Sequence, residues 1–241
     1  MLEGINYNLL KYWEAVGNRP GWAITNVDEA VFLKSPTNVP NLNLCLNPAE
    51  VSHVESAQSF FGDKTFGIIS DEKVSLPSEC TPLLDIELGE MHLAASAITS
   101  SEDVVGIELV QGAVALKEWC YLCAGINGMD YDEVYAFFSP QLELETGGLF
   151  LAYHNGSPVG TGQVIIDDRQ LAYICSIGVV EDTRRQGLGT KIMNKIVHYG
   201  LERNAQTFAL HASNMGRFLY GKLGFELKKT CAFTIVEGLD H

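Results

Sequence analysis

The chain is organised around residues 177–189, whose sequence is Ile-Gly-Val-Val-Glu-Asp-Thr-Arg-Arg-Gln-Gly-Leu-Gly. Residues 171–180, which include its start, are almost continuously apolar, as is typical of a strand buried on both faces. Apolar residues then recur at helical spacing over residues 188–199. Gly187 and Gly189 are therefore predicted to lie at a turn from a strand to a helix.

A glycine-containing turn of this kind is suited to bind an anion. The first N–H groups of a helix have no intrahelical partner and lie at the positive end of the helix dipole, and glycine has no Cβ to hold a ligand away. Four basic residues add positive charge, namely Arg184, Arg185, Lys191 and Lys195. The alternative is that the glycines only allow a tight turn and that the arginines form a solvated face.

Two other phosphate-binding motifs do not fit this stretch. It has no Gly-Lys-Ser/Thr sequence, as in a P-loop, and no third glycine, as in the Rossmann fingerprint. It has Arg-x-x-Gly-x-Gly after a strand that ends in Val, and this resembles the acyl-CoA loop of the GNAT superfamily of N-acetyltransferases. Residues 213–225 end in Leu-Tyr-x-Lys-Leu-Gly-Phe, which resembles the second motif of the same family.

The second part of the chain, residues 103–241, is predicted to be a catalytic GNAT N-acetyltransferase domain with an α/β fold (α+β, mixed sheet). Strands are expected at 104–110, 149–154, 159–166, 171–180, 207–212 and 231–237, and helices at 113–124, 131–138 and 214–223, besides the helix after Gly187. The strand-helix-strand crossover makes 207–212 parallel to 171–180. Asn155-Gly156 indicates a hairpin turn.

Residues 1–102 are predicted to form a smaller α/β domain, accessory or a degenerate GNAT-like half. Strands are expected at 22–25, 30–33, 41–46, 65–69 and 83–88, with a helical stripe that ends at Gly17 and a helix at 48–61. This half contains no Arg-x-x-Gly-x-Gly, so its likeness to the degenerate first half of tandem GNAT proteins rests only on the order of its elements. Residues 95–103, rich in Ser and Thr, are the expected linker.

Composition and charge narrow the class of protein. With 241 residues, 46% of them hydrophobic and 19% charged, the chain is expected to be a globular cytoplasmic protein with neither a signal peptide nor a membrane span. Residues 1–140 hold 20 acidic and 6 basic residues, whereas residues 182–241 hold 9 basic and 5 acidic ones. The acidic remainder argues against nucleic acid and is compatible with a cationic amine. Cys120-x-x-Cys123 has no partner pair, so no metal is expected.

The resemblance implies roles for backbone groups of the loop. Those of Ile177, Gly178 and Val179 are expected to bind the pantetheine and polarise the thioester. Residues with a cofactor role are expected to be, besides these three, Arg184, Arg185, Gln186, Gly187, Leu188, Gly189, Thr190 and Ser213, with the amides of residues 185–190 on the pyrophosphate. Arg185 either reaches the 3′-phosphate or faces water.

Tyr220 stands five residues before Phe225, where many members of the family keep a tyrosine that protonates the CoA thiolate. It is the expected catalytic residue, and the alternative is a core aromatic of an amphipathic helix. The general base stays open, because Cys175 and Ser176 occupy the strand positions where members often carry a carboxylate. Tyr173, His211, His154, or Glu145 acting through water are candidates, or the amine arrives unprotonated.

The predicted function is direct acetyl transfer from acetyl-CoA to a primary amine of a small molecule or peptide. Two alternatives stay open at this point, namely a non-catalytic acyl-CoA-binding regulatory protein and a structural domain with a vestigial anion site. The identity of the amine and the oligomeric state are also open, with a homodimer as one option.

Overall fold

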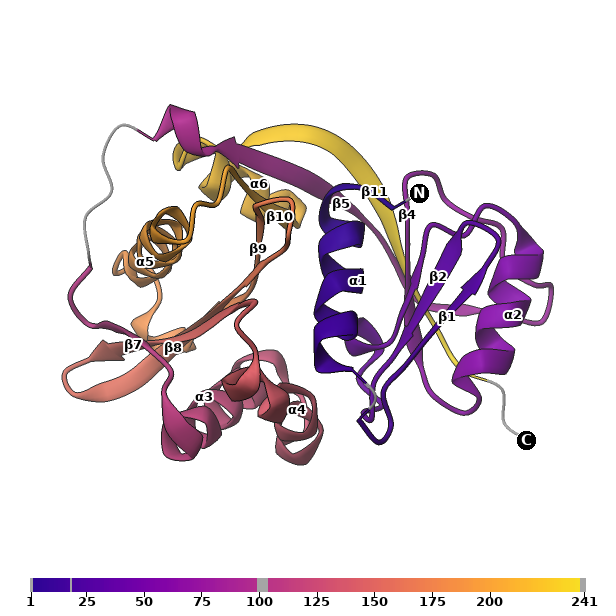
Figure 1. Cartoon of the computed structure of the whole chain (residues 1–241), viewed down its shortest axis with the longest axis horizontal. Coiled ribbons are helices and arrows are strands. Elements are labelled where there is room, and N and C mark those ends of the chain that lie inside the picture. The colour runs from indigo at the N-terminus through magenta and orange to yellow at the C-terminus, as the bar shows by residue number, and fades with distance from the viewer. Residues whose placement is uncertain (1, 18, 99–103, 239–241) are drawn as a thin grey trace. The chain divides into compact units, whose positions relative to one another are not determined.

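The computed structural model describes the chain except for residues 1, 18, 99–103 and 239–241 (Figure 1). The described residues form two compact units. The first takes in the chain up to Met91, together with His211–Gly221 and the chain from Leu227 on, and the second takes in His92–Leu210 and Lys222–Glu226. The boundary that we predict between residues 102 and 103 lies outside the described residues, and the two proposed domains stay a prediction.

The first unit is a mixed sheet with two helices from the N-terminal half. Its helices are α1 (Gly4–Val16) and α2 (Val51–Phe61), and its strands are β1 (Ala23–Val27), β2 (Ala30–Lys34), β3 (Leu44–Leu46), β4 (Phe66–Ser70), β5 (Pro82–Ala94) and β11 (Glu226–Val236). The strands β1, β2 and β3 are successive antiparallel neighbours, β3 and β4 are parallel, and β4 and β11 are antiparallel. The α2 helix connects the parallel pair, as a parallel connection requires.

Aromatic side chains fill the core of this unit between α2 and the sheet. Phe32, Phe61 and Phe66 are completely buried, and the rings of Phe61 and Phe66 stack with 4.5 Å between their centroids. Val236 of β11 belongs to the same core, so the end of the chain completes the N-terminal sheet.

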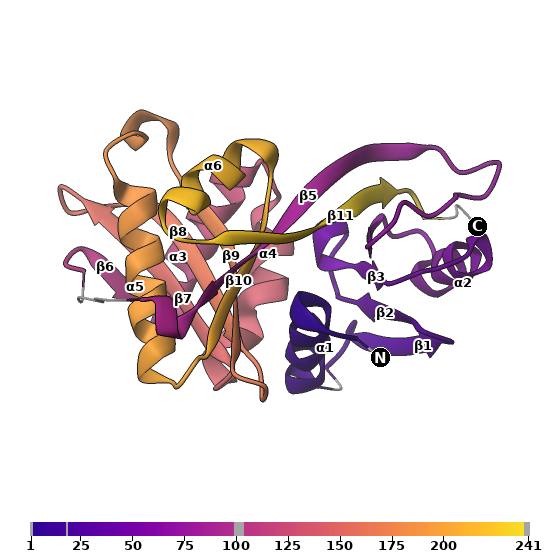
Figure 2. The same cartoon turned by 90° about the horizontal axis from the view of Figure 1, so that it is seen from above.

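The pairing of β11 corrects our expectation that residues 231–237 close the second unit. Phe233 pairs with Ile69, and Val236 pairs with Phe66, so this strand extends the sheet of the first unit. On its other edge β11 neighbours β5, and the two long strands run side by side (Figure 2). A strand pattern in a sequence records which residues are buried but not which distant strand covers the edge.

The second unit holds residues 177–189. Its strands are β6 (Ile107–Leu109), β7 (Gly147–His154), β8 (Ser157–Ile166), β9 (Leu171–Val179) and β10 (Thr207–Ala212, assigned to this unit through Leu210), and its helices are α3 (Gly112–Asn127), α4 (Tyr131–Phe138) and α5 (Leu188–Glu202). The strand order is β10-β9-β8-β7-β6, and β10 is parallel to β9, as predicted. Asn155 and Gly156 both have positive φ at the β7–β8 hairpin, as that turn requires.

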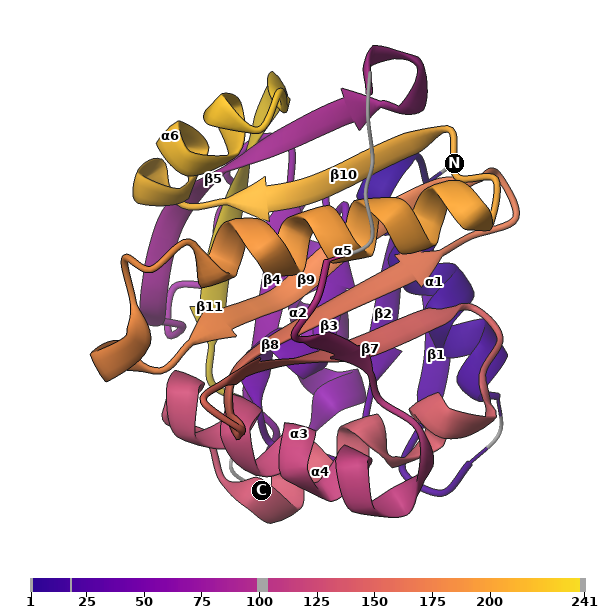
Figure 3. The same ribbon diagram turned by 90° about the vertical axis from the view of Figure 1, so that its left-hand side faces the viewer.

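The helices of this unit cover opposite faces of its sheet, with α5 on one face and α3 and α4 on the other (Figures 1 and 3). A Cβ added at Gly162 would lie 2.6 Å from Ile192 of α5, so this glycine lets the helix approach the sheet closely. On the other face, Trp119 of α3 is completely buried and donates to the Phe150 carbonyl at 3.1 Å. The sheet is thus buried on both faces, as the apolar run 171–180 predicts.

Short 3₁₀ turns account for several boundary differences. The predicted strand 41–46 begins only at Leu44, because Pro40–Leu42 forms the turn η1, and the linker begins with the turn η2 (Ala95–Ala97). Two further turns, η3 (Ser139–Glu143) and η4 (Glu181–Thr183), flank β7 and follow β9. The last helix, α6 (Asn214–Lys222), follows β10 and falls in the first unit through Gly221.

Candidate functional site

The loop between β9 and α5 has the backbone conformation of an anion-binding turn. After η4 the chain is extended at Arg184, then turns left-handed at Arg185, with φ 62°, and at Gly187, with φ 77°. Gly187 is the N-cap of α5 and no side chain caps this helix end. Two left-handed residues so close together direct successive N–H groups toward one side of the loop.

The N-terminus of α5 has N–H groups available for a ligand. The first intrahelical bond is donated by the Lys191 N–H to the Gly187 carbonyl at 3.0 Å. The N–H groups of Leu188, Gly189 and Thr190 precede it and so have no partner within the helix. A Cβ added at Gly187 or at Gly189 would meet no atom within 4 Å, so the space in front of this helix end is open.

Arg184 and Arg185 behave differently, although they are neighbours in the sequence. The Arg184 side chain folds back, and its Nε donates to the Val179 carbonyl at 3.0 Å. Arg185 and Gln186 are exposed at the outer side of the loop. Arg184 therefore holds the loop against the end of β9, whereas Arg185 is presented to solvent.

Strand β9 separates from β10 as it approaches this loop. The parallel register pairs Leu171 with Thr207 and ends where Tyr173 meets Ala209, while β9 continues to Val179. Because the Val180 N–H donates to the Val159 carbonyl, strand alternation directs the Val179 N–H and carbonyl away from β8. The Val179 N–H therefore lies on the edge of β9 where the pairing with β10 has ended.

A bulge in β9 lies just before Val179. The register shifts opposite Gly162, and Ser176 has a positive φ of 54°. The Thr161 hydroxyl donates to the Ser176 carbonyl at 3.0 Å, and this bond stabilises the bulge. The half-buried residues Ile177 and Gly178 follow, so the bulge determines how their backbone is presented.

A cavity of about 340 Å³ lies where α3 meets the end of β9. Its lining combines residues of both elements and of the loop, namely Tyr121, Leu122, Gly125, Ile126, Val180, Glu181 and Arg184. The cavity therefore adjoins Val179 and offers an aromatic ring, a carboxylate and apolar surface.

The side chains on the bulge supply no strong base. The Cys175 thiol and the Ser176 hydroxyl both donate to the Gln163 Oε1, at 3.1 and 3.2 Å. Burial raises the pKa of Cys175 to about 12, so the thiol stays protonated at neutral pH. Sequence reasoning missed Gln163, whose buried Nε2 has no hydrogen-bond partner among the described residues, because an isolated Gln in an apolar strand has no recognisable signal.

The candidate bases separate along the sheet. Gly147 pairs with Ile165 and Ile165 pairs with Tyr173, so Glu145 and Tyr173 lie at the end of the sheet away from Val179. His154 ends β7 at the same end as Val179. Glu145 therefore does not belong to the site that we expected it to serve, and His211 lies in the other unit.

Tyr220 and Ser213 lie on α6 and just before it, in the first unit. Tyr220 is half-buried, and burial raises the pKa of its hydroxyl above the usual value. The Ser213 hydroxyl accepts from the Gly216 N–H at 3.2 Å and so caps the start of α6. Their roles toward a cofactor stay predictions.

Known proteins resemble this arrangement of loop and sheet. Residues 114–225 match the model of the acetyltransferase (GNAT) family. An uncharacterized N-acetyltransferase of Methanocaldococcus jannaschii is 31% identical over 102 residues, which are 39% of this chain and 45% of that protein. The chain thus matches less than half the length of this relative.

Two solved structures share the fold of the whole chain. A GNAT-family protein of Novosphingobium aromaticivorans has a TM-score of 0.68 at 16% identity, over 97% of this chain and 96% of its own. A GCN5-related N-acetyltransferase of Kribbella flavida has a TM-score of 0.67 at 17% identity, over 98% and 95% of the two chains. The predicted mixed α/β fold is confirmed.

The open loop at the N-terminus of α5, the splayed strand β9 and the shared fold define an acyltransferase domain. Residues 114–225 belong to the GNAT family of acetyltransferases. No helix among the described residues is both long and apolar enough to cross a membrane. The described residues also contain no cluster of three or more His, Cys, Asp or Glu side chains that could hold a metal ion.

Proposed function

We propose that this protein transfers an acetyl group from acetyl-CoA directly to a primary amine of a small molecule or peptide. The observation that carries the proposal is the N-terminus of α5, where the N–H groups of Leu188, Gly189 and Thr190 precede the first intrahelical bond. A pyrophosphate is the anion that such a helix end binds best, because several N–H groups and the helix dipole act together.

The chain's own groups fit the rest of acetyl-CoA. The Val179 N–H, on the unpaired part of β9, would donate to the pantetheine or to the thioester carbonyl. The open space at Gly189 leaves room for the phosphates. When bound, acetyl-CoA supplies a thioester whose acyl group an amine can accept.

Transfer forms a C–N bond at the acceptor and breaks the C–S bond, so the departing thiolate needs a proton. We assign this proton to the Tyr220 hydroxyl, because burial raises its pKa and keeps it protonated at neutral pH. The acceptor must also lose a proton, and the described side chains of the β9 bulge offer no carboxylate for this.

We propose that the acceptor enters the cavity between α3 and the end of β9. Tyr121 and Glu181 line it, and a carboxylate beside an aromatic ring suits a protonated amine before it reaches the thioester. The acceptor is thus expected to be a cationic amine. An amine without a second charged group should be accepted, because the only basic residue in the lining is Arg184.

An acyl-CoA-binding regulatory protein without turnover is the second candidate function. It is favoured by the bulge, where Cys175 and Ser176 both donate to Gln163 and neither acts as a base. Release of CoA thiol, measured with a panel of amines and acetyl-CoA, separates the two functions. Binding without thiol release from any amine would support the regulatory protein.

The test of the proposal is Gly189→Leu, with Gly221→Leu as its matched control. A Cβ at either glycine meets no atom within 4 Å, and both lie in helices, so both variants should fold as well as the wild type. Calorimetry should show that acetyl-CoA binding falls at least about tenfold in Gly189→Leu alone. Equal binding by Gly189→Leu and the wild type would overturn the proposal.

We further propose one acetyl-CoA per chain and a cytoplasmic location. The first supports follow from the sequence, since Arg-x-x-Gly-x-Gly occurs once, at residues 184–189. The six cysteines are free thiols, which suits a reducing compartment. A calorimetric stoichiometry of two would contradict the first statement.

A further inference from the structure

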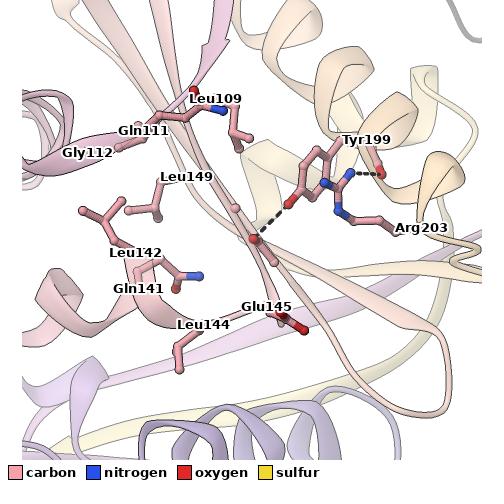
Figure 4. A pocket seen from close by; sticks show the side chains of 13 residues that line it. Leu109, Gln111, Gly112, Gln141, Leu142, Leu144, Glu145, Leu149, Tyr199 and Arg203 are labelled. Carbon is pink, nitrogen blue, oxygen red and sulfur yellow. Dashed lines mark hydrogen bonds between the residues drawn. The ribbon is translucent and has the colours of Figure 1, made fainter.

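A second and larger cavity lies in the same unit, at the opposite end of α5 from the loop (Figure 4). Its volume is about 640 Å³, within the range of about 300–1,000 Å³ that small-molecule sites occupy. Tyr199 and Arg203 enter it from the last turns of α5, and η3 with the residues that follow it forms the facing wall. Nothing in the proposed acetyl transfer uses this cavity.

Gln141 of η3 is a buried polar residue without a partner. Its side chain is only 4% exposed, and neither its Nε2 nor its Oε1 makes a hydrogen bond with any described residue. The carboxamide is directed toward the space between η3 and α5 (Figure 4). A buried amide that lacks both bonds is costly, and a bound molecule with a donor and an acceptor would remove that cost.

One cation is held in place at this cavity. The Arg203 guanidinium lies 3.4 Å from the centre of the Tyr199 ring, and its Nη1 donates to the Tyr199 carbonyl at 3.4 Å. The Tyr199 hydroxyl in turn donates to the Gly147 carbonyl at 2.9 Å, which anchors the ring. The guanidinium is therefore preorganised, and its remaining N–H groups suit a carboxylate.

One anion lines the cavity as well. Glu145 follows η3 and is the only acidic residue among the described lining residues, as Arg203 is the only basic one. Most of the remaining side chains of the lining are aliphatic, among them Leu109, Leu142 and Leu149. The wall therefore combines one positive group, one negative group, a free carboxamide and an apolar surface.

From this combination we propose that the cavity binds a free α-amino acid with an apolar side chain. Arg203 takes its carboxylate, Glu145 takes its ammonium group, and the leucine-rich wall takes its side chain, with the Gln141 carboxamide completing the polar contacts. A zwitterion satisfies both charges at once, whereas a simple acid or amine leaves one of them without a partner. This site is independent of the acetyl-CoA site.

Calorimetry on the full chain with L-leucine as the probe tests the proposal. We expect one molecule per chain with a dissociation constant below about 1 mM. Two analogues separate the charges, because 4-methylpentanoate lacks the ammonium group and 3-methylbutylamine lacks the carboxylate. Each should bind at least about tenfold more weakly than leucine. An absence of leucine binding, or tighter binding of either analogue, would overturn the proposal.

Variants assign the two ends of the ligand. Arg203→Met should weaken leucine binding at least about tenfold. Glu145→Gln should do the same for leucine and leave 4-methylpentanoate binding unchanged. Lys117→Met is the control, since this exposed lysine of α3 does not line the cavity. Wild-type affinity in the first two variants would refute the assignment, and the circular dichroism of each variant reports its folding.

Discussion

The Nε of Arg184 donates to the carbonyl of Val179 at 3.0 Å, five residues back along the chain. This bond ties the loop before α5 to the last residue of β9, so the strand that would hold the pantetheine and the helix end that would hold the phosphates keep a defined spacing. An exposed bond of this kind contributes little to global stability, about 0.5–1.5 kcal/mol at most. Its importance is for the arrangement of the loop.

Arg184→Met should therefore affect binding more than folding. The variant loses one positive charge and the bond to Val179, and we expect the dissociation constant of acetyl-CoA to rise about tenfold. The midpoint of thermal unfolding should change by only a few degrees, because the side chain is exposed. Lys117→Met removes a positive charge elsewhere and should leave acetyl-CoA binding as it is. Calorimetry and thermal melts measure both quantities.

Gly187 and Gly189 should respond differently to alanine. Gly187 has a φ of 77°, so Gly187→Ala should lower the free energy of unfolding by about 1–2 kcal/mol. Gly189 lies in the first turn of α5 with space around it, so Gly189→Ala should leave stability unchanged or raise it by up to about 1 kcal/mol. Urea unfolding of the two variants gives the comparison, and equal effects would contradict the left-handed loop.

Tyr220→Phe tests the proposed general acid. If the hydroxyl protonates the thiolate, turnover should fall by about 10² to 10⁴, with acetyl-CoA affinity and melting temperature nearly unchanged. A packing role would leave Tyr220→Phe silent, whereas Tyr220→Ala would lower stability by about 3 kcal/mol. Turnover of the Phe variant within a few-fold of the wild type, for a substrate whose chemical step limits the rate, would exclude the acid role.

The pH profile provides a second measurement on Tyr220. Burial raises the pKa of its hydroxyl, and a general acid acts only while it is protonated. Activity that depends on it should therefore persist up to the usual tyrosine pKa of about 10 and fall only above that pH. An alkaline decline centred well below pH 10 that disappears in Tyr220→Phe would contradict the raised pKa.

A fragment of residues 103–241 should fold poorly by itself. It retains β11 but loses β4 and β5, the two strands that β11 neighbours, and Val236 loses the core that it shares with Phe61 and Phe66. An unpaired strand of this length is an aggregation site. Gel filtration and circular dichroism of the fragment should show aggregation or incomplete folding. A monomeric fragment with the melting temperature of the full chain would contradict this expectation.

Local patterns in the sequence determined the parts of the fold that depend on neighbouring residues. The helix predicted at residues 131–138 is α4 with the same boundaries, and the strand-helix-strand order around Gly187 made β9 and β10 parallel. The left-handed Gly187 was also predictable, because a strand that turns directly into a helix needs such a residue there. These features follow from periodicity and backbone sterics, which act over a few residues.

Only the tertiary structure decided which distant segments meet. The strand that ends the chain pairs with β4, some 165 residues earlier, because edge pairing is a long-range choice that the alternation of residues leaves open. The unpartnered Gln141, the stacked Arg203 and Glu145 come together from η3, the residues after it and α5, and none of them has a spacing that marks a site. The sequence by itself thus determined the anion-binding loop and the class of chemistry. The cavity at the other end of α5 depends on how three separated segments pack against each other, which is a property of the folded chain.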